Sequence, residues 1–345
     1  MRMVREAAGP PAGVGVAWRA ARRIAGYGAA LSMASYLVVK VIWVVAAFVG
    51  RAPEGFGTAD WVTLNAVTVA MATTGVGLGL ALAQRWGRRL PTVPVVFFSW
   101  VGAGFLVPMI PYMAAGGLLG ASGADAGGAR DGSGLVPRWE TALITVGFTG
   151  MALGLAVALP IYLRERWPRA FLGRLRGGEA GARPLVTAAI VATVGLGVLW
   201  SSWALGGRLG LDPAHREDGD LNGRLLNATS GLWALIGAWS VWALTRGRPG
   251  RLRRWLPMSL AFAGSGSLFA WSGWKLAMVI LRPGGFTTAE YTGVAIAEHA
   301  LGVGLGLTLL TAVLRSVRPA GPESPNHAAP AGMGTRTTGP GAGGG

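Results

Sequence analysis

The sequence predicts an all-α fold, a polytopic bundle of about eight transmembrane helices built from repeated two-helix hairpins. Three observations predict it. Hydrophobic residues make up 52% of the 345-residue chain and charged residues only 13%, a composition unlike that of a soluble domain. Eight segments are long and apolar enough to cross the ~30 Å hydrocarbon core of a bilayer, which takes roughly 20 residues. Arginine-rich and arginine-poor loops alternate, as the positive-inside rule requires.

The apolar segments follow one another along most of the chain. They lie at residues 27–50, 60–84, 93–118, 139–163, 185–206, 224–245, 257–281 and 290–314. The first is too long for the core of a signal peptide, which spans about 7 to 15 residues, so we expect it to be retained as a helix. Short connections on both sides of the second predict a tight antiparallel hairpin. Pro108 and Pro111 predict a break in the third.

The longest inside connection divides the chain into two transmembrane halves of four helices each. The predicted parts are a cytoplasmic basic leader, the first half, a basic cytoplasmic loop, the second half and a cytoplasmic tail. They cover residues 1–26, 27–163, 164–183, 184–317 and 318–345, respectively. The tail is rich in Pro, Gly, Ala and Thr, so it is predicted to be disordered.

The formal net charge of +16 predicts membrane topology rather than nucleic-acid binding. With the N-terminus inside, the inside segments hold 22 arginines and the outside segments seven. Both termini are therefore predicted to be cytoplasmic, in a multi-pass protein of the plasma membrane. The implied partner is the lipid bilayer, with anionic lipid at the cytoplasmic face. No nucleic-acid partner is expected.

Short motifs recur along the chain and predict an internal repeat. Lys40-x-x-Trp43, Trp200-x-x-Trp203 and Trp271-x-x-Trp274 share one spacing. Four copies of a hairpin, or one duplicated pair of hairpins, would explain the repeat, although the third helix fits poorly. Glycines four residues apart predict flat helix faces that let a neighbouring helix pack closely, within the chain or in an oligomer. These pairs are Gly75 and Gly79, Gly150 and Gly154, and Gly302 and Gly306.

Ionisable and amide side chains inside the apolar segments are the candidate functional residues. A charge at membrane depth costs at least ~2.5 kcal/mol, so such groups are disfavoured without a purpose. Both lysines lie inside segments, whereas all 29 arginines lie at or beyond segment ends. We expect the candidates to converge on one outward-facing polar cavity that binds a small molecule or holds ion pairs. The candidates are Lys40, Asn65, Asn227, Lys275, Glu298 and His299.

Each candidate also has a simpler interpretation. Lys275 and Glu298 lie at similar depths in one hairpin, so an ion pair is available, but Lys275 could instead extend its amine to the membrane surface. His299 points ~100° away from Glu298 around the helix. Asn65 and Asn227 could simply form hydrogen bonds between helices. Glu140 occupies the corresponding place in the fourth segment.

A metal site or cofactor receives little support from the sequence. The absence of cysteine excludes disulfides, thiolate metal sites and a cysteine nucleophile. Asp218, Asp220 and Asn222 copy the first half of a calcium-binding loop. Thr229 stands at the twelfth position, where a bidentate glutamate belongs, so an ordinary acidic turn is the competing interpretation. We expect no cofactor and no other metal.

Three short motifs carry a resemblance to known proteins. They are Tyr36-Leu-Val-Val-Lys40-Val-Ile-Trp43, Leu64-Asn65-Ala66 and Gln84-Arg-Trp-Gly-Arg-Arg-Leu-Pro91. With them the chain resembles the uncharacterised multi-pass integral membrane proteins that are common in actinomycetes, over most of residues 27–317. The resemblance implies a membrane location, and it supplies no activity and no functional residues.

Three classes of function remain open. A transporter or small-molecule-binding permease-like protein is the leading hypothesis, because repeated hairpins with polar groups near their centre suit a binding site at the membrane midplane. It predicts a solvated cavity lined by Lys40 and Glu298. A non-catalytic scaffold, sensor or accessory subunit is the alternative, and it predicts that the same groups are paired and dry. A membrane-embedded enzyme would need Glu298 and His299 to face a common pocket.

Overall fold

The computed structural model describes residues 15–51, 58–121, 138–175, 184–215, 221–282 and 286–317, and it confirms the all-α prediction. Apart from two isolated bridges, the regular structure of these ranges is helical. The long helices are α1 (Val16–Phe48), α2 (Thr58–Ala83), α3 (Thr92–Leu106), α4 (Met109–Ala121), α5 (Arg138–Arg166), α7 (Pro184–Ala204), α8 (Leu221–Arg246), α9 (Trp255–Leu281) and α10 (Thr292–Val317). The short helices are η1 (Trp86–Arg89), α6 (Pro168–Phe171) and η2 (Pro213–His215).

The first helix begins 11 residues earlier than the hydropathy pattern predicts. Residues 16–26, assigned to the cytoplasmic leader from the sequence, form the first three turns of α1. Alanine and arginine are strong helix formers, so this stretch is helical although it is not apolar. At 1.5 Å per residue, the 33 residues of α1 span ~50 Å, well beyond the ~30 Å hydrocarbon core. α1 is therefore longer than a crossing of the hydrocarbon core requires, and its first three turns carry Arg19, Arg22 and Arg23.

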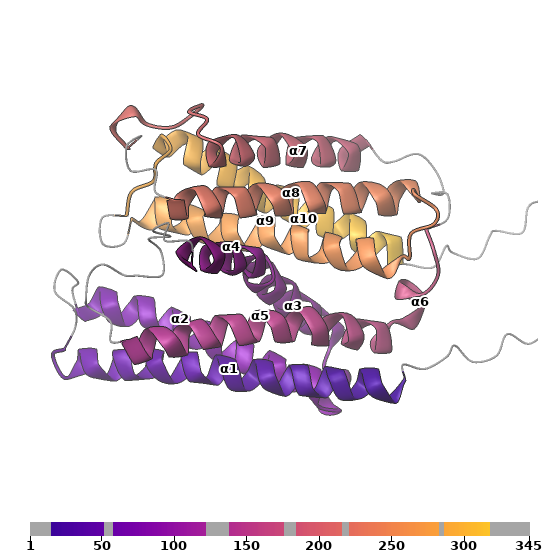
Figure 1. Cartoon of the computed structure of the whole chain (residues 1–345), viewed down its shortest axis with the longest axis horizontal. Coiled ribbons are helices and arrows are strands. Elements are labelled where there is room, and N and C mark those ends of the chain that lie inside the picture. Colours follow the sequence, from indigo (N-terminus) through magenta and orange to yellow (C-terminus); the bar gives the residue numbers. More distant parts are fainter. Residues whose placement is uncertain are drawn as a thin grey trace, which may run out of the picture.

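The predicted break in the third segment is present as the junction between α3 and α4. α3 ends at Leu106, and α4 starts at Met109, directly after Pro108. Proline has no backbone N–H and its ring crowds the preceding turn, which favours a break or a kink at this point. In Figure 1, α3 crosses the bundle obliquely and α4 turns back towards the direction of the other helices.

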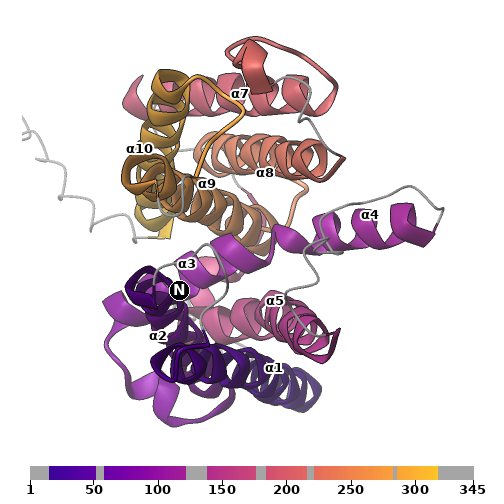
Figure 2. The ribbon, with the colours of Figure 1, turned by 90° about the vertical axis from the view of Figure 1, so that its left-hand side faces the viewer.

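The long helices form two groups, with α3 between them. Figures 1 and 2 show α1, α2 and α5 on one side and α7, α8, α9 and α10 on the other. α1 packs most extensively on α5 and α2, and α9 packs on α10 and α8. α3 belongs to the first half of the sequence, yet its main partner is α9. The two halves are therefore joined mainly through the α3–α9 contact.

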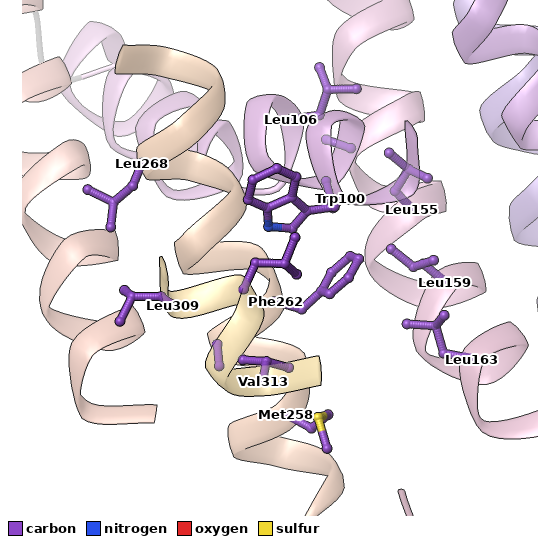
Figure 3. Close-up of a cluster of buried hydrophobic side chains, with 14 of the residues drawn as sticks. Trp100, Leu106, Leu155, Leu159, Leu163, Met258, Phe262, Leu268, Leu309 and Val313 are labelled. Atoms are coloured by element: carbon purple, nitrogen blue, oxygen red, sulfur yellow. The ribbon is translucent and has the colours of Figure 1, made fainter. Parts of the chain in front are cut away.

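A tryptophan and two glycines make this contact close. Trp100 is completely buried, stacks on Phe269 at 4.7 Å between ring centroids and donates its indole N–H to Ser265 Oγ at 3.0 Å. Figure 3 shows Trp100 among leucines of α5 and apolar side chains of α9 and α10. Gly104 faces Gly266 backbone to backbone, so close that a Cβ on Gly104 would lie 2.7 Å from Gly266 Cα.

The glycine pairs spaced by four residues do form close helix contacts, as predicted. A Cβ on Gly79 would lie 2.8 Å from Ala30 N, one on Gly154 2.7 Å from Ala25 O and one on Gly306 2.8 Å from Phe269 N. These contacts join α2 and α5 to α1, and α10 to α9. Because these faces are covered within the chain, an oligomer would have to use other surfaces.

The protein is a multi-pass membrane protein by the length and composition of its helices. Among the residues that the structure describes, six helical segments are long and apolar enough to cross a membrane. They are α1, α2, the α3–α4 pair, α5, α7 and α10. The sequence predicts eight, and the remaining two, α8 and α9, are helices of 26 and 27 residues that are not among these six. α9 lies between α3, α8 and α10, where a helix needs less lipid-facing apolar surface.

Candidate functional site

The candidate residues of the first half form a cluster between α1, α2 and α5. Lys40 on α1 donates a hydrogen bond to Asn65 Oδ1 on α2, at 3.1 Å. The Asn65 amide donates in turn to Trp61 O at 2.8 Å, and the Asn65 side chain is 1% exposed. The oxygen and the nitrogen of the Asn65 side-chain amide thus each form a hydrogen bond. The bond to Lys40 is the hydrogen bond between helices that the sequence analysis considers for this residue.

An aromatic ring separates Lys40 from the nearest carboxylate. The Lys40 amine lies 3.9 Å from the centroid of Trp43, a distance at which a cation is attracted to the ring face. The Trp43 indole N–H donates to Glu140 Oε2 on α5 at 2.7 Å. Trp61 packs beside Trp43 with 5.5 Å between ring centroids. We call Lys40, Trp43, Asn65 and Glu140 the first cluster, in which each polar side chain has a partner.

The Lys40–Asn65 hydrogen bond should be measurable as a coupling free energy. Lys40→Met and Asn65→Leu should each destabilise the protein by about 1.5 to 3 kcal/mol, the usual contribution of a hydrogen bond to a charged group. The double variant should be clearly less destabilised than the sum of the two single variants, because the second change removes a group that has already lost its partner. Thermal unfolding in detergent measures the three values, and strict additivity would contradict the contact.

The second cluster lies between α7, α9 and α10. The Trp200 indole N–H on α7 donates to Glu298 Oε2 on α10 at 3.1 Å. The other carboxylate oxygen, Oε1, lies 3.2 Å from His299 Nε2, in an orientation that makes no hydrogen bond. Glu298 is 5% exposed and His299 2% exposed. Lys275 and Ser272 on α9 belong to the same region, and we call Trp200, Ser272, Lys275, Glu298 and His299 the second cluster.

Several buried polar atoms of the second cluster have no hydrogen-bond partner among the described residues. They are Glu298 Oε1, both ring nitrogens of His299 and the Ser272 hydroxyl. Leaving such a group unsatisfied costs ~1 to 3 kcal/mol, and more where it is charged. Ser272 packs directly against Gly302, one turn along α10 from His299. The second cluster therefore combines carboxylate, imidazole and hydroxyl groups whose hydrogen-bonding capacity is not used within the described residues.

Two geometric expectations for this cluster are not met. Lys275 is only half-buried and takes part in no ion pair within the part of the chain that the structure describes, so the available pair with Glu298 is not formed. His299 and Glu298, expected ~100° apart, bring their side chains into contact. Helical side chains lean towards the helix N-terminus, and the flexible glutamate can swing across that angle. Depth along a helix predicts height in the membrane, and it does not predict side-chain direction.

Two loops, one after α7 and one before α10, pair with each other at the end of the bundle nearest the second cluster. Leu211 and Glu290 form an isolated bridge, with hydrogen bonds from Asp212 N to Ala289 O at 2.9 Å and from Tyr291 N to Gly210 O at 3.2 Å. Glu290 is itself buried and repels the Glu298 carboxylate electrostatically, whereas Lys275 attracts it.

Five of the six candidates fall into two clusters rather than one cavity, and Asn227 belongs to neither cluster. Lys40 and Asn65 belong to the α1, α2 and α5 group, whereas Lys275, Glu298 and His299 belong to the α7–α10 group, and α3 runs between the groups (Figure 2). Asn227 on α8 is half-buried and makes no hydrogen bond in the described ranges, unlike its predicted equivalent Asn65. The candidates are divided between two clusters because the two helix groups meet through the α3–α9 contact. No pattern in the sequence predicts this contact.

The candidates predicted from the sequence do not include the tryptophans that bind the two buried carboxylates. Trp43 binds Glu140 and Trp200 binds Glu298, so each cluster holds one indole–carboxylate hydrogen bond between helices. The spacing that defines the predicted repeat contains both tryptophans, and this was the available signal. A shared origin of the hairpins remains a prediction.

The calcium hypothesis falls largely outside the described residues, because Asp218 and Asp220 lie there. Asn222 is described, and its Oδ1 accepts a hydrogen bond from Tyr112. Within the described ranges, no three side chains of the metal-binding types come together. Searches of protein-family models, of curated proteins and of solved structures found no significant match to the chain.

Proposed function

We propose that this multi-pass membrane protein binds a small polar solute at the second cluster and acts as a transporter or permease. The observation that supports the proposal is the set of buried polar atoms on Glu298, His299 and Ser272 that make no hydrogen bond to the part of the chain the structure describes. Ionisable groups inside a membrane are costly and usually mark a pathway or a site. A solute with hydrogen-bonding groups of its own would satisfy them.

The proposed orientation places the second cluster near the outer surface. The arginine distribution favours cytoplasmic termini in the plasma membrane. Glu298 lies six residues after the start of α10 at Thr292, or ~9 Å from that end of the helix. A solute from outside would meet the paired loops at Leu211 and Glu290 first, so these loops would act as the outer gate.

A non-catalytic scaffold or sensor is the second candidate, and the first cluster favours it. Lys40, Asn65, Trp43 and Glu140 are all paired, which is what a purely structural polar network requires. If the second cluster were equally dry, the scaffold would explain both. The two functions therefore differ in whether water reaches Ser272.

Cysteine accessibility tests this difference, because the chain contains no cysteine of its own. Ser272→Cys places a thiol in the second cluster. Ser265→Cys is the matched control, since Ser265 lies two turns earlier on α9, is fully buried and is bonded to Trp100. A small hydrophilic methanethiosulfonate should modify Cys at 272 at least about ten times faster than at 265, because a thiol must be hydrated to ionise.

Either result is informative about the proposal. Faster modification at 272, from the outside of intact cells, supports a solute site that opens outwards. Equal and negligible modification at both positions would mean that the second cluster is dry, and the scaffold would then be the better account.

A further inference from the structure

The inner end of the first helix group contains a basic pocket that the proposed function does not use. It is a cavity of about 430 Å³, within the ~300 to 1,000 Å³ typical of small-molecule sites. Five arginines and one glutamate line it: Arg19, Arg22, Arg23, Arg85, Arg88 and Glu165. They come from the first turns of α1, from η1 and its preceding residue, and from the end of α5. We call this cavity the arginine pocket.

One arginine and the glutamate form the floor of the arginine pocket. Arg22 Nε lies 3.3 Å from Glu165 Oε2, and the two side chains are 3% and 7% exposed. Arg22 also donates a hydrogen bond to Leu82 O at the end of α2. This pair neutralises itself. The other four arginines are exposed and form no ion pair within the described part of the chain, so the pocket carries an excess of four positive charges.

The wall that carries Arg85 and Arg88 is held rigidly. Arg166 on α5 donates to Gly87 O at 3.3 Å and to Leu90 O at 2.6 Å, and Tyr162 donates to Gly87 O at 2.8 Å. Gly87 itself fits because it lacks a Cβ, which would collide with the backbone of Ala81. The backbone that carries these two arginines is thus fixed before any ligand arrives, so only their side chains have to be ordered on binding.

The arginine pocket lies where lipid headgroups are found. The first three turns of α1 extend beyond the length needed for the hydrocarbon core. Trp18 and Trp86, both exposed, lie on the same two elements, and tryptophan is enriched at the membrane–water interface. Guanidinium groups bind phosphate oxygens with paired, charge-assisted hydrogen bonds.

We propose that the arginine pocket binds a phosphate group of an anionic molecule, presented by a phospholipid headgroup at the membrane surface or by a soluble phosphate compound. Arg19 and Arg23 from α1 and Arg85 and Arg88 at η1 hold the phosphate oxygens. The Arg22–Glu165 pair joins α1 to α5, and α5 in turn holds η1 through Tyr162 and Arg166. The site is separate from the second cluster, so it stands whether or not a solute binds there.

The test compares two variants with the same loss of charge. Arg19→Gln/Arg88→Gln removes one arginine from each wall of the pocket and leaves the Arg22–Glu165 pair intact. Arg251→Gln/Arg253→Gln removes two exposed arginines from the loop before α9, outside the pocket. Both variants and the parent, as full chains in detergent, are titrated with dioleoyl-phosphatidylglycerol and, separately, with the zwitterionic dioleoyl-phosphatidylcholine. Native mass spectrometry measures the lipid-bound fraction.

We expect the parent to bind phosphatidylglycerol more tightly than phosphatidylcholine, whose choline cation the arginines repel. The pocket variant should lose about thirtyfold in affinity, since each arginine contributes about a factor of five at a membrane surface. The control variant should bind like the parent. Equal losses in the two double variants would reduce the effect to general surface charge and overturn the proposal, as would an unchanged pocket variant.

A competition arm identifies the source of the phosphate. Inorganic phosphate and glycerol 3-phosphate are added at millimolar concentration to the lipid-bound parent. Displacement of phosphatidylglycerol, absent when sodium chloride of equal ionic strength is added, supports the site with a soluble ligand. Retention of the lipid supports the site with a headgroup ligand. Displacement by sodium chloride alone would show a surface effect and count against the pocket.

Discussion

Gly104→Ala should destabilise the folded protein by about 3 kcal/mol, the upper part of the usual range for over-packing. A methyl group there would lie 2.7 Å from Gly266 Cα, against backbone that cannot rotate away. α3 and α9 would have to separate, and with them the two groups of helices. Gly266→Ala should act similarly, because its methyl group would lie 2.5 Å from Trp100 O.

Gly102→Ala is the matched control on the same helix. Its added methyl group would lie 3.5 Å from Leu78 Cδ2, an ordinary contact. Alanine is the better helix former by up to ~1 kcal/mol, so this variant should be as stable as the parent or slightly more stable. Thermal unfolding in detergent, followed by tryptophan fluorescence, measures all three variants. A Gly104→Ala protein as stable as Gly102→Ala would show that the α3–α9 contact can relax.

The helices could be predicted from the sequence because membrane helices follow local rules. Hydropathy places seven segments within a few residues of their helices, and Pro108 marks the break between α3 and α4. The predicted start of the first helix was wrong because a helix can continue beyond the apolar stretch where arginine and alanine favour it. A hydropathy pattern predicts which residues of a helix lie in lipid, and it does not predict where the helix begins or ends.

The arrangement of the polar residues could be predicted only in part. Lys40 and Asn65 meet because their helices form a hairpin, so chain connectivity brings them together. Convergence of these two with Glu298 and His299 would need the halves to meet along another face. The face along which the halves do meet is determined by Trp100, Gly104 and Gly266, whose contacts join residues more than 160 positions apart in the sequence.

The arginine pocket could not be predicted because its acidic partner gave no distinct signal. Glu165 is flanked by Arg164 and Arg166, and such a run is ordinarily a solvated helix end. Only the fold shows that Glu165 is buried against Arg22, 143 positions earlier in the chain. Charge patterns predict the side of the membrane, whereas pairing between distant charges depends on the packing of α1 against α5.

The Arg22–Glu165 pair should be the second large contributor to stability. Glu165→Gln leaves the Arg22 guanidinium buried without a counter-charge, which should cost about 3 to 5 kcal/mol. Arg22→Met should cost at least as much, because it strands the Glu165 carboxylate and also removes the hydrogen bond to Leu82 O. Both values are read from thermal unfolding in detergent. Arg23→Met is the control, since Arg23 is the exposed neighbour and should change stability by no more than about 0.5 kcal/mol.

The double variant Arg22→Met/Glu165→Leu tests whether the Arg22 and Glu165 charges stabilise each other. Replacing a buried pair by apolar side chains is often neutral, so the double variant should be more stable than either single variant. A double variant as unstable as the sum of the singles would mean that each charge is satisfied independently, by water rather than by its partner. The pair would then not hold α1 against α5, and the N-terminal part of α1 would be anchored by the Arg22 hydrogen bond to Leu82 O and by the glycine contacts with α2 and α5.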